Sequence, residues 1–310
     1  MTVRRITWLV ALASLLGGRA WAQDPKFQFG KQEEVKEVEW KAQAKAGLVL
    51  TTGNSQTTTF TAGTSLSRKE KENKFSFDAG LAYAQSSIYV LNDLNMNGTI
   101  DNRQELQRLD STTANQWFAK ARYDRFFTEH NSAYISANFA GDEVAGKDLD
   151  AGGQIGYSRQ LYKDDKHESI AEIGYDLMYE KLSAAPDAVI IHSARIFLGH
   201  TSKLTGSTAV FANFEVLFNL NTEEKALRPI GNDMSAQGVD AFDDTRINAK
   251  AGLSTTLWKN VSFAFSYALK YDHAPAPLPA PKGAKFAMDF VPFAETLDTI
   301  TEAALVVNFF

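Results

Sequence analysis

Residues 40–51 read WKAQAKAGLVLT, and apolar side chains occupy every second position of this stretch. A period of two is the period of a β-strand, whose successive side chains point to opposite faces. The stretch is also long enough to cross a bilayer, because a tilted barrel strand needs ~9–11 residues. It predicts a strand with one face toward lipid and the other toward a polar interior. The apolar face would carry Trp40, Ala42, Ala44, Ala46, Leu48 and Leu50.

The same alternation returns along most of the chain. After a turn at 52–55, Phe60, Ala62, Thr64 and Leu66 share one face of a second strand, and residues 74–83 form a third. The count reaches about twelve strands, and an even number brings both ends of the sheet to one side of a membrane. The remaining candidates are 112–127, 132–141, 151–162, 169–182, 192–203, 208–220, 245–258, 261–272 and 296–310.

The connections alternate between short and long, apart from the first turn. A soluble antiparallel sheet can also alternate polar and apolar residues, but this loop asymmetry is typical of barrels with periplasmic turns and external loops. We therefore predict an all-β, transmembrane, antiparallel up-and-down β-barrel of about 12 strands. The short turns are 69–73, 128–131, 163–168, 204–206 and 259–260, and the long loops lie near 88–110, 142–150, 183–191, 221–244 and 273–295.

The N-terminus predicts export. Arg4 and Arg5 precede an apolar run over 6–16, and Ala20-Trp21-Ala22 fits a cleavage site. The run is shorter than the ~20 residues of a spanning helix. We expect a signal peptide at 1–22, a periplasmic polar lead-in at 23–37 and an outer-membrane β-barrel at 38–310. The absence of cysteine fits passage through an oxidising periplasm, and the net charge of -5 gives no indication of nucleic-acid binding.

The segment 51–58, Thr-Thr-Gly-Asn-Ser-Gln-Thr-Thr, follows the first predicted strand. It resembles the opening hairpin of the YdiY-like, salt-induced outer membrane proteins, a family defined by a domain of unknown function. The strand around 153–157 and the terminal Phe310 are also similar to that family, and the resemblance covers about 38–310. It implies an outer-membrane barrel without established catalytic residues, so no functional site is carried over.

The C-terminal strand indicates two partners. A barrel of this kind is surrounded by outer-membrane lipid, and a C-terminal aromatic such as Phe310 is what barrel-assembly machinery commonly recognises. The end departs from the usual pattern, because Asn308 stands where an aromatic or apolar residue is preferred. Leu305, Val307 and Phe309 share one face of the last strand, and this face is apolar. The sequence therefore leaves open whether this face or the face of Asn308 and Phe310 meets lipid.

The predicted inward faces collect charges of both signs. A water-filled path with charged rings would select solutes, whereas a salt-bridge network would fill a narrow barrel. Barrels of about eight strands are filled by side chains and those of about 16–18 leave a channel, so twelve lies between. The candidate lumen residues are Lys45, Lys74, Asp78, Lys120, Arg122, Glu172, Asp176, Arg195, Glu215, Lys250 and Lys270.

One predicted external loop resembles a calcium-binding turn. Asp93, Asn95, Asn97, Thr99 and Asp101 have the spacing of EF-type oxygen ligands, with Gly98 at the sharp turn. Position twelve is Gln104 instead of the bidentate Glu, so the alternative is an ordinary Asn-Gly turn. We expect at most weak calcium binding and no other cofactor.

Three functions compete. A passive pore for ions or small polar solutes is favoured over a structural or adhesive barrel with a plugged lumen and functional external loops. A lipid-modifying enzyme comes third, because neither His192 beside Ser193 nor His200 near Ser202 has a third group to orient the base. We therefore expect no enzyme. The alternating prolines 275, 277, 279 and 281 predict a stiff external loop or a flap over the mouth.

Overall fold

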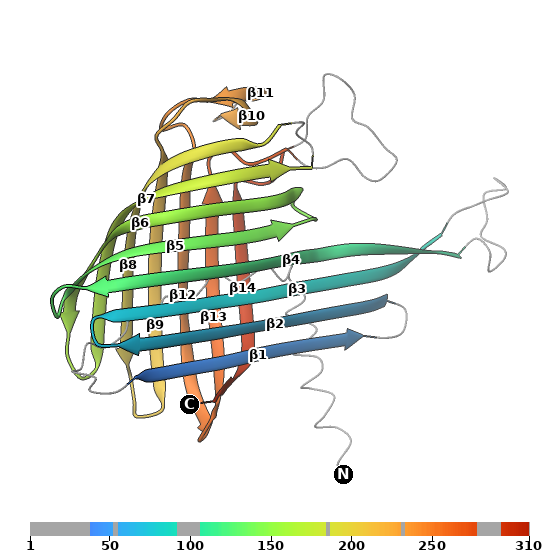
Figure 1. Cartoon of the computed structure of the whole chain (residues 1–310). Helices are drawn as coiled ribbons and strands as arrows, with labels where there is room; N and C mark the ends of the chain where they lie inside the picture. The colour runs from blue at the N-terminus through green and yellow to red at the C-terminus, as the bar shows by residue number, and fades with distance from the viewer. Residues whose placement is uncertain are drawn as a thin grey trace, which may run out of the picture.

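The computed structural model describes residues 38–51, 55–91, 106–183, 187–230, 233–277 and 293–309. Twelve strands close into an antiparallel barrel in the order β1-β14-β13-β12-β9-β8-β7-β6-β5-β4-β3-β2 (Figure 1). A separate two-stranded sheet pairs β10 with β11. Over these ranges, no helix has the length and apolar character needed to cross a membrane. The predicted fold class is confirmed.

The strands follow one another along the chain as neighbours, so nearly every connection is a hairpin. The exception is the step from β9 to β12, which is interrupted by the small hairpin β10–β11. The strands are β1 (Glu39–Thr51), β2 (Ser55–Glu70), β3 (Asn73–Leu91), β4 (Leu106–Phe126), β5 (Asn131–Asp142), β6 (Lys147–Lys163), β7 (His167–Leu182), β8 (Val189–Lys203), β9 (Thr208–Asn219), β10 (Glu223–Ile230), β11 (Asp233–Val239), β12 (Thr245–Trp258), β13 (Val261–Asp272) and β14 (Leu297–Asn308).

Four predicted long loops contain more strand than expected: β6 begins at Lys147 inside 142–150, β8 begins at Val189 inside 183–191, and the differences in 88–110 and 221–244 are larger. β3 and β4 continue pairing as far as Leu91 with Leu106, so part of the predicted loop 88–110 is a hairpin. The first residue of β2, Ser55, pairs with Ile88, so β3 and β4 extend beyond the edge of β2. The predicted loop 221–244 contains β10 and β11, whose short segments EEKALRPI and DMSAQGV lack the alternation of the barrel strands. The barrel strands themselves were predicted at the correct places.

The outer face of the barrel is apolar. Ile135, Ile155 and Ile173 lie on three consecutive strands and are 56%, 58% and 60% exposed. Such a belt of exposed large side chains is unfavourable in water and matches the hydrocarbon layer of a membrane. Trp40, Trp117 and Trp258 are exposed on the same outer surface, where aromatic residues commonly meet the interface.

The last strand has a defined orientation. Leu305, Val307 and Phe309 are 52%, 39% and 58% exposed and point outward. Val306 and Glu302 have the opposite parity and are more covered. The apolar parity therefore faces lipid, which answers the question that the sequence left open; Phe310 lies outside the described residues.

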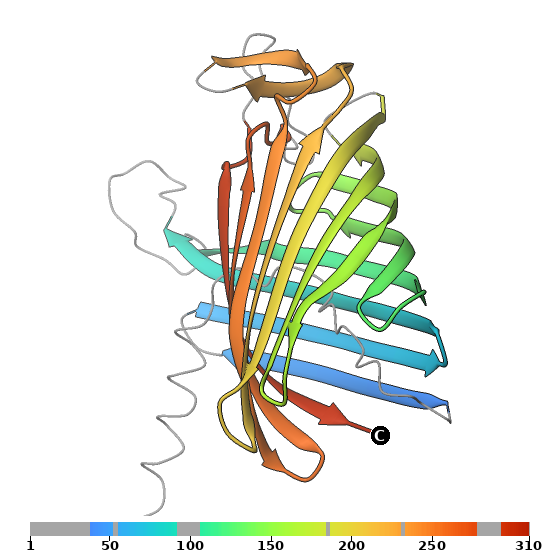
Figure 2. The ribbon, with the colours of Figure 1, turned by 90° about the vertical axis from the view of Figure 1, so that its left-hand side faces the viewer.

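The longest connections lie at one end of the barrel, although the β5–β6 turn at that end, 143–146, is as short as the β4–β5 turn at the other. In Figure 2 the tight turns between β8 and β9 and between β12 and β13 lie at the bottom, and the β10–β11 hairpin lies at the top. The turn after β8 is closed by hydrogen bonds from the Leu204 and Thr205 amides to the Thr208 carbonyl. The hairpin at the opposite end is held by an apolar cluster of Val189, Ile191, Ala226, Val239 and Ala274.

Candidate functional site in the barrel lumen

Tyr134 reaches across the inner wall of the barrel. Tyr134 pairs with Gly156 on β6, Gly156 pairs with Gly174 on β7, and Gly174 pairs with Arg195 on β8, so the four residues lie in one row across the sheet. A Cβ added at either glycine would lie 2.6 Å from the Tyr134 hydroxyl oxygen, so both positions must lack a side chain. The ring can therefore lie flat over two strands, and its hydroxyl accepts a hydrogen bond from Arg195 Nη1 at 2.9 Å.

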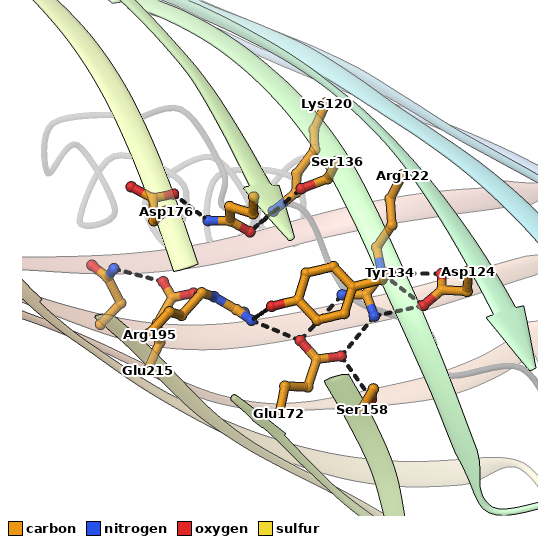
Figure 3. A network of polar contacts seen from close by, with 12 residues as sticks. Lys120, Arg122, Asp124, Tyr134, Ser136, Ser158, Glu172, Asp176, Arg195 and Glu215 are labelled. Atoms are coloured by element: carbon orange, nitrogen blue, oxygen red, sulfur yellow. Dashed lines mark hydrogen bonds and ion pairs between the residues drawn. The ribbon is translucent and has the colours of Figure 1, made fainter. Parts of the chain in front are cut away.

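A buried ionic network surrounds this tyrosine (Figure 3). Glu172 bridges two guanidinium groups: Arg122 Nη2 donates to Glu172 Oε1 at 2.7 Å, and Arg195 Nη1 donates to Glu172 Oε2 at 2.7 Å. Ser158 Oγ donates to the same carboxylate at 3.0 Å. Arg122 also donates to Asp124 through two of its nitrogens. The charges are almost completely withdrawn from solvent, since Arg195 and Glu172 are each 1% exposed.

Aromatic rings complete the network. The Arg122 guanidinium lies 4.0 Å from the centroid of the Tyr134 ring, and the Arg195 guanidinium lies 5.1 Å from that of Phe197. Both are cation–π distances. Buried charges are tolerated when they are paired and hydrogen-bonded, as they are here. The network therefore forms a rigid filling along the β4–β8 wall.

The network continues toward the long-loop end. Arg195 Nε donates to Glu215 Oε1 at 2.6 Å, and Glu215 Oε2 accepts from Asn248 at 2.9 Å. Gln154 links Lys120, at 3.5 Å, to Asp176, at 2.8 Å. These side chains form the floor of a larger space.

That space is a cavity of about 620 Å³ in the long-loop half of the barrel. Pro275, Ala276, Phe293 and Ala294 belong to the segments between β13 and β14, and they line it on the side of the mouth. Ala276 is buried against Leu182 at the end of β7, and three strands, β12, β9 and β8, lie between β7 and β13 in the barrel order. The described residues 273–277 therefore extend over the mouth; Pro279 and Pro281, the other prolines of the predicted stiff loop or flap, lie outside the described residues.

Several ion pairs lie along the wall of this cavity near the long loops. Arg246 contacts Asp244 at 2.7 Å and lies 3.8 Å from Glu180 and 3.9 Å from Asp272. Lys147 lies 3.5 Å from Asp150 and 3.6 Å from Glu180. Charged groups of opposite sign thus alternate around the lumen, and the wall provides donors and acceptors for polar solutes.

The opposite wall is more open to water. Glu302 on β14 lies 3.7 Å from Lys45 on β1 and 3.8 Å from Lys250 on β12. The three side chains are 22%, 27% and 11% exposed. At the level of the Arg122–Glu172–Arg195 network the lumen is therefore asymmetric: large buried groups fill the β4–β8 side, and partly exposed charges lie on the β12–β14–β1 side. Nearer the mouth, Lys147 on β6 is partly exposed as well.

A protein-family model described as "Protein of unknown function, DUF481" matches residues 44–227, which is more than half of the chain. The chain belongs to the DUF481 family. This membership confirms the resemblance that the segment 51–58 indicated. A search of curated proteins gave no match.

Several solved barrels overlap with this DUF481 protein. The NanC porin has 6% identity and a TM-score of 0.41, with 86% of this chain and 98% of that chain covered. An anion-selective porin from Comamonas acidovorans has 10% identity and a TM-score of 0.37, covering 88% and 99%. The transport unit of the autotransporter AIDA-I from Escherichia coli has 11% identity and a TM-score of 0.35, covering 97% of both chains. These overlaps are too loose to transfer any property of those proteins to this chain.

The DUF481 barrel brings most of the predicted lumen residues together. Arg122, Glu172, Arg195 and Glu215 form one network, and Gln154 joins Lys120 to Asp176. Lys45 and Lys250 meet at Glu302, and Lys270 lines the cavity. Lys74 and Asp78 point inward on β3 but are not among the residues that line the cavity. Asp78 accepts a hydrogen bond from Ser65 Oγ at 2.6 Å.

Sequence reasoning missed the centre of this site. Tyr134, Ser158 and Glu302 were not among the candidates, although all three have inward parity on predicted strands. The signal that identifies Tyr134 in the sequence is its inward parity as a hydrogen-bonding side chain without charge. Its position between two guanidinium groups depends on the register of four strands, which no single strand reveals.

The other candidates have separate outcomes. Asp93, Asn95, Asn97, Thr99 and Asp101 lie outside the described residues, and the described ranges contain no cluster of three metal-ligating side chains. His192 faces outward to the Tyr175 hydroxyl, and Ser193 is buried on the inner face. His200 Nδ1 lies 2.8 Å from Ser169 Oγ on the neighbouring strand.

Proposed function

We propose that this protein is an outer-membrane β-barrel whose lumen forms a narrow pore for ions or small polar solutes. The observation that carries the proposal is the lumen itself, with a cavity of about 620 Å³ that charged side chains line in part, and a wall of partly exposed charges at Lys45, Lys250 and Glu302. A barrel that only served as a scaffold would have no need for solvated charges of both signs along one wall.

The cellular location is part of this proposal. The apolar exterior requires a lipid environment, and the predicted signal peptide at 1–22 directs the chain across the inner membrane. With the tight turns in the periplasm, the cavity and the β10–β11 hairpin face the external medium. Membrane lipid contacts the apolar belt, and barrel-assembly machinery would engage β14 together with Phe310.

The buried network on the β4–β8 side limits the size of the solutes that can pass through the lumen. The Arg122–Glu172–Arg195 network occupies the β4–β8 side, so a solute must pass between it and the β12–β14–β1 wall. Twelve strands enclose less space than the about 16–18 strands of an open porin. We infer passage of single ions and of solutes no larger than a few heavy atoms, with no catalytic step.

Liposome swelling tests this size limit. Liposomes carrying the refolded protein are diluted into isosmotic solutions of urea, glycerol or sucrose. The proposal predicts swelling that is fastest in urea, slower in glycerol and absent in sucrose. The same rate as protein-free liposomes in all three solutions would favour the second candidate, a plugged envelope barrel with functional external loops, which the buried network supports.

A further inference from the structure

The strands β5 to β9 give one side of the lumen cavity an acidic lining. They contribute one cation, Lys147, and four carboxylates, those of Asp142, Asp150, Asp176 and Glu215. Counted over every charged side chain that these strands add to the lining, whether or not it is paired, the formal charge of this acidic arc is -3.

The rest of the cavity wall, from β12 through β14 to β4, is more basic. This basic arc adds four cations to the lining, Lys120, Arg246, Lys250 and Lys270. It also adds three carboxylates, Asp272, Glu295 and Asp298, so its formal charge is +1 on the same count. The charge of the lining therefore changes sign around the circumference of the barrel.

The two arcs face each other across the lumen. In a closed ring of twelve strands, strands six places apart are diametrically opposite, which places β5 opposite β13. Asp142 at the end of β5 and Lys270 on β13 both line the cavity and are close enough to interact electrostatically. The field of the cavity therefore has a component across the lumen, directed from the basic arc toward the acidic arc.

Each arc also has hydrogen-bonding capacity for a solute. On the acidic side, Asp150 Oδ1 and Asn138 Oδ1 are buried and accept no hydrogen bond within the described part of the chain. On the basic side, the Lys250 ammonium lies 3.8 Å from the Glu302 carboxylate, longer than a direct hydrogen bond. Its register partner Asn213 lines the cavity beside it. A solute could thus donate to the first side and accept from the second.

This arrangement of charge distinguishes between classes of solute. A simple cation or anion is attracted by one arc and repelled by the other, and a neutral solute interacts weakly with both. A zwitterion that lies across the lumen places each of its charged ends next to the arc of opposite sign, so both interactions are favourable. The lining therefore favours a solute that carries one ammonium and one carboxylate group.

We propose that the cavity selects small zwitterions, such as the smallest amino acids, for passage through the lumen. The ammonium group of the solute points toward Asp142 and Asp150, and its carboxylate points toward Lys250 and Lys270. This inference rests on the proposed pore and names the class of solute that the pore favours.

Glycine and glycolamide test the inference, because they are isomers and only glycine is a zwitterion at neutral pH. Liposomes carrying the refolded mature protein are diluted into isosmotic solutions of each, and the swelling rate of protein-free liposomes is subtracted. We expect swelling in glycine to be about threefold faster than in glycolamide, the factor that corresponds to one weak, water-exposed ion pair.

The same liposomes in urea separate the two possible failures. Swelling in urea with equal rates in glycine and glycolamide, or with a faster rate in glycolamide, would overturn the selectivity and leave the pore standing. No swelling in any of the three solutes would overturn the pore and this inference together.

Two double variants should remove the preference from opposite sides. Asp142→Asn/Asp150→Asn neutralises part of the acidic arc, and asparagine at 142 keeps an oxygen for the Ala145 amide, which donates to Asp142 Oδ1 at 3.0 Å. Lys250→Gln/Lys270→Gln neutralises part of the basic arc. In each, the ratio of the glycine rate to the glycolamide rate should fall close to one in liposomes that still swell in urea. A fall in only one of the two would show attraction of a single charged group and overturn the transverse arrangement.

Glu129→Gln/Asp165→Asn is the matched control. It removes the same number of negative charges as the acidic-arc variant, from exposed positions in two tight turns at the opposite end of the barrel. The wild-type ratio should be kept. An equal loss of preference in this control and in Asp142→Asn/Asp150→Asn would assign the effect to the net charge of the protein and overturn the role of the cavity.

Discussion

The Tyr134 hydroxyl and Arg195 Nη1 are joined by a hydrogen bond of 2.9 Å, although two complete strands separate their backbones. Gly156 and Gly174 make this possible, because their missing side chains leave a trough for the ring. The contact ties β5 to β8 on the inner wall. It also presents the tyrosine face to Arg122, whose guanidinium lies 4.0 Å from the ring centroid.

Filling the trough should destabilise the barrel. In Gly174→Val the new Cβ would lie 2.6 Å from the Tyr134 hydroxyl oxygen and 2.8 Å from the Ile155 carbonyl oxygen. We expect a loss of about 1–3 kcal/mol, typical of overpacking, measured by urea unfolding of the refolded protein in detergent micelles. Gly206→Ala is the control, since nothing lies within 4 Å of its added Cβ. Equal stabilities would contradict the trough.

Removing the central charge should have a larger effect. Glu172→Gln leaves Arg122 and Arg195 buried without their shared carboxylate. Breaking a buried ion pair by deleting one partner costs about 3–5 kcal/mol. Glu70→Gln breaks an exposed Arg68–Glu70 pair instead and should cost at most about 1 kcal/mol. Unfolding midpoints compare the two variants, and a similar small shift in both would argue against a structural network.

The orientation of β1 predicts opposite outcomes for adjacent substitutions. Ala46 faces outward and Lys45 faces the lumen. Ala46→Asp puts a charge into hydrocarbon and should hinder insertion, whereas Lys45→Asp should not. Heat-modifiable migration of each variant, before and after boiling, reports the folded fraction. Equal folded fractions would contradict the assigned parity.

Acid sensitivity should arise in part from the turn between β6 and β7. The Tyr162 hydroxyl and the His167 and Lys166 amides donate to the Asp164 carboxylate and lower its pKa to about 2. Because the pKa is depressed below its unfolded value of about 3.9, the contribution is complete above that value and is lost as the pH falls through 2. Asp164→Ala should flatten the dependence of stability on pH between about 4 and 2. An unchanged acid profile would show that the turn contributes nothing.

The barrel was predictable because membrane strands show their two environments directly in the sequence. Trp40, Phe75 and Leu81 alternate with polar residues, since each strand has lipid on one side and the lumen on the other. β10 and β11 carry no such signal, because the hairpin does not cross the apolar belt and is held by a few side chains such as Ala226 and Val239.

The lumen was predictable as a set of residues but not as an arrangement. The inward parity of Arg122, Glu172 and Arg195 was visible in the sequence. The register of β4 to β8 determines that both arginines share the Glu172 carboxylate. The closure of the barrel depends on the register between β1 and β14, which neither strand reveals alone. Long-range register thus separates what the sequence predicts from what only the structure shows.

Conductance of single barrels in a planar bilayer tests the central claim most directly. We expect stepwise increments for the wild-type protein. For Lys250→Glu we expect the reversal potential in a salt gradient to shift toward cation selectivity, because Lys250 lies on the partly exposed wall of the lumen. Glu302→Gln should displace it toward anions. Inserted, correctly folded barrels that show no current steps, or steps whose selectivity ignores both substitutions, would contradict a pore along this wall.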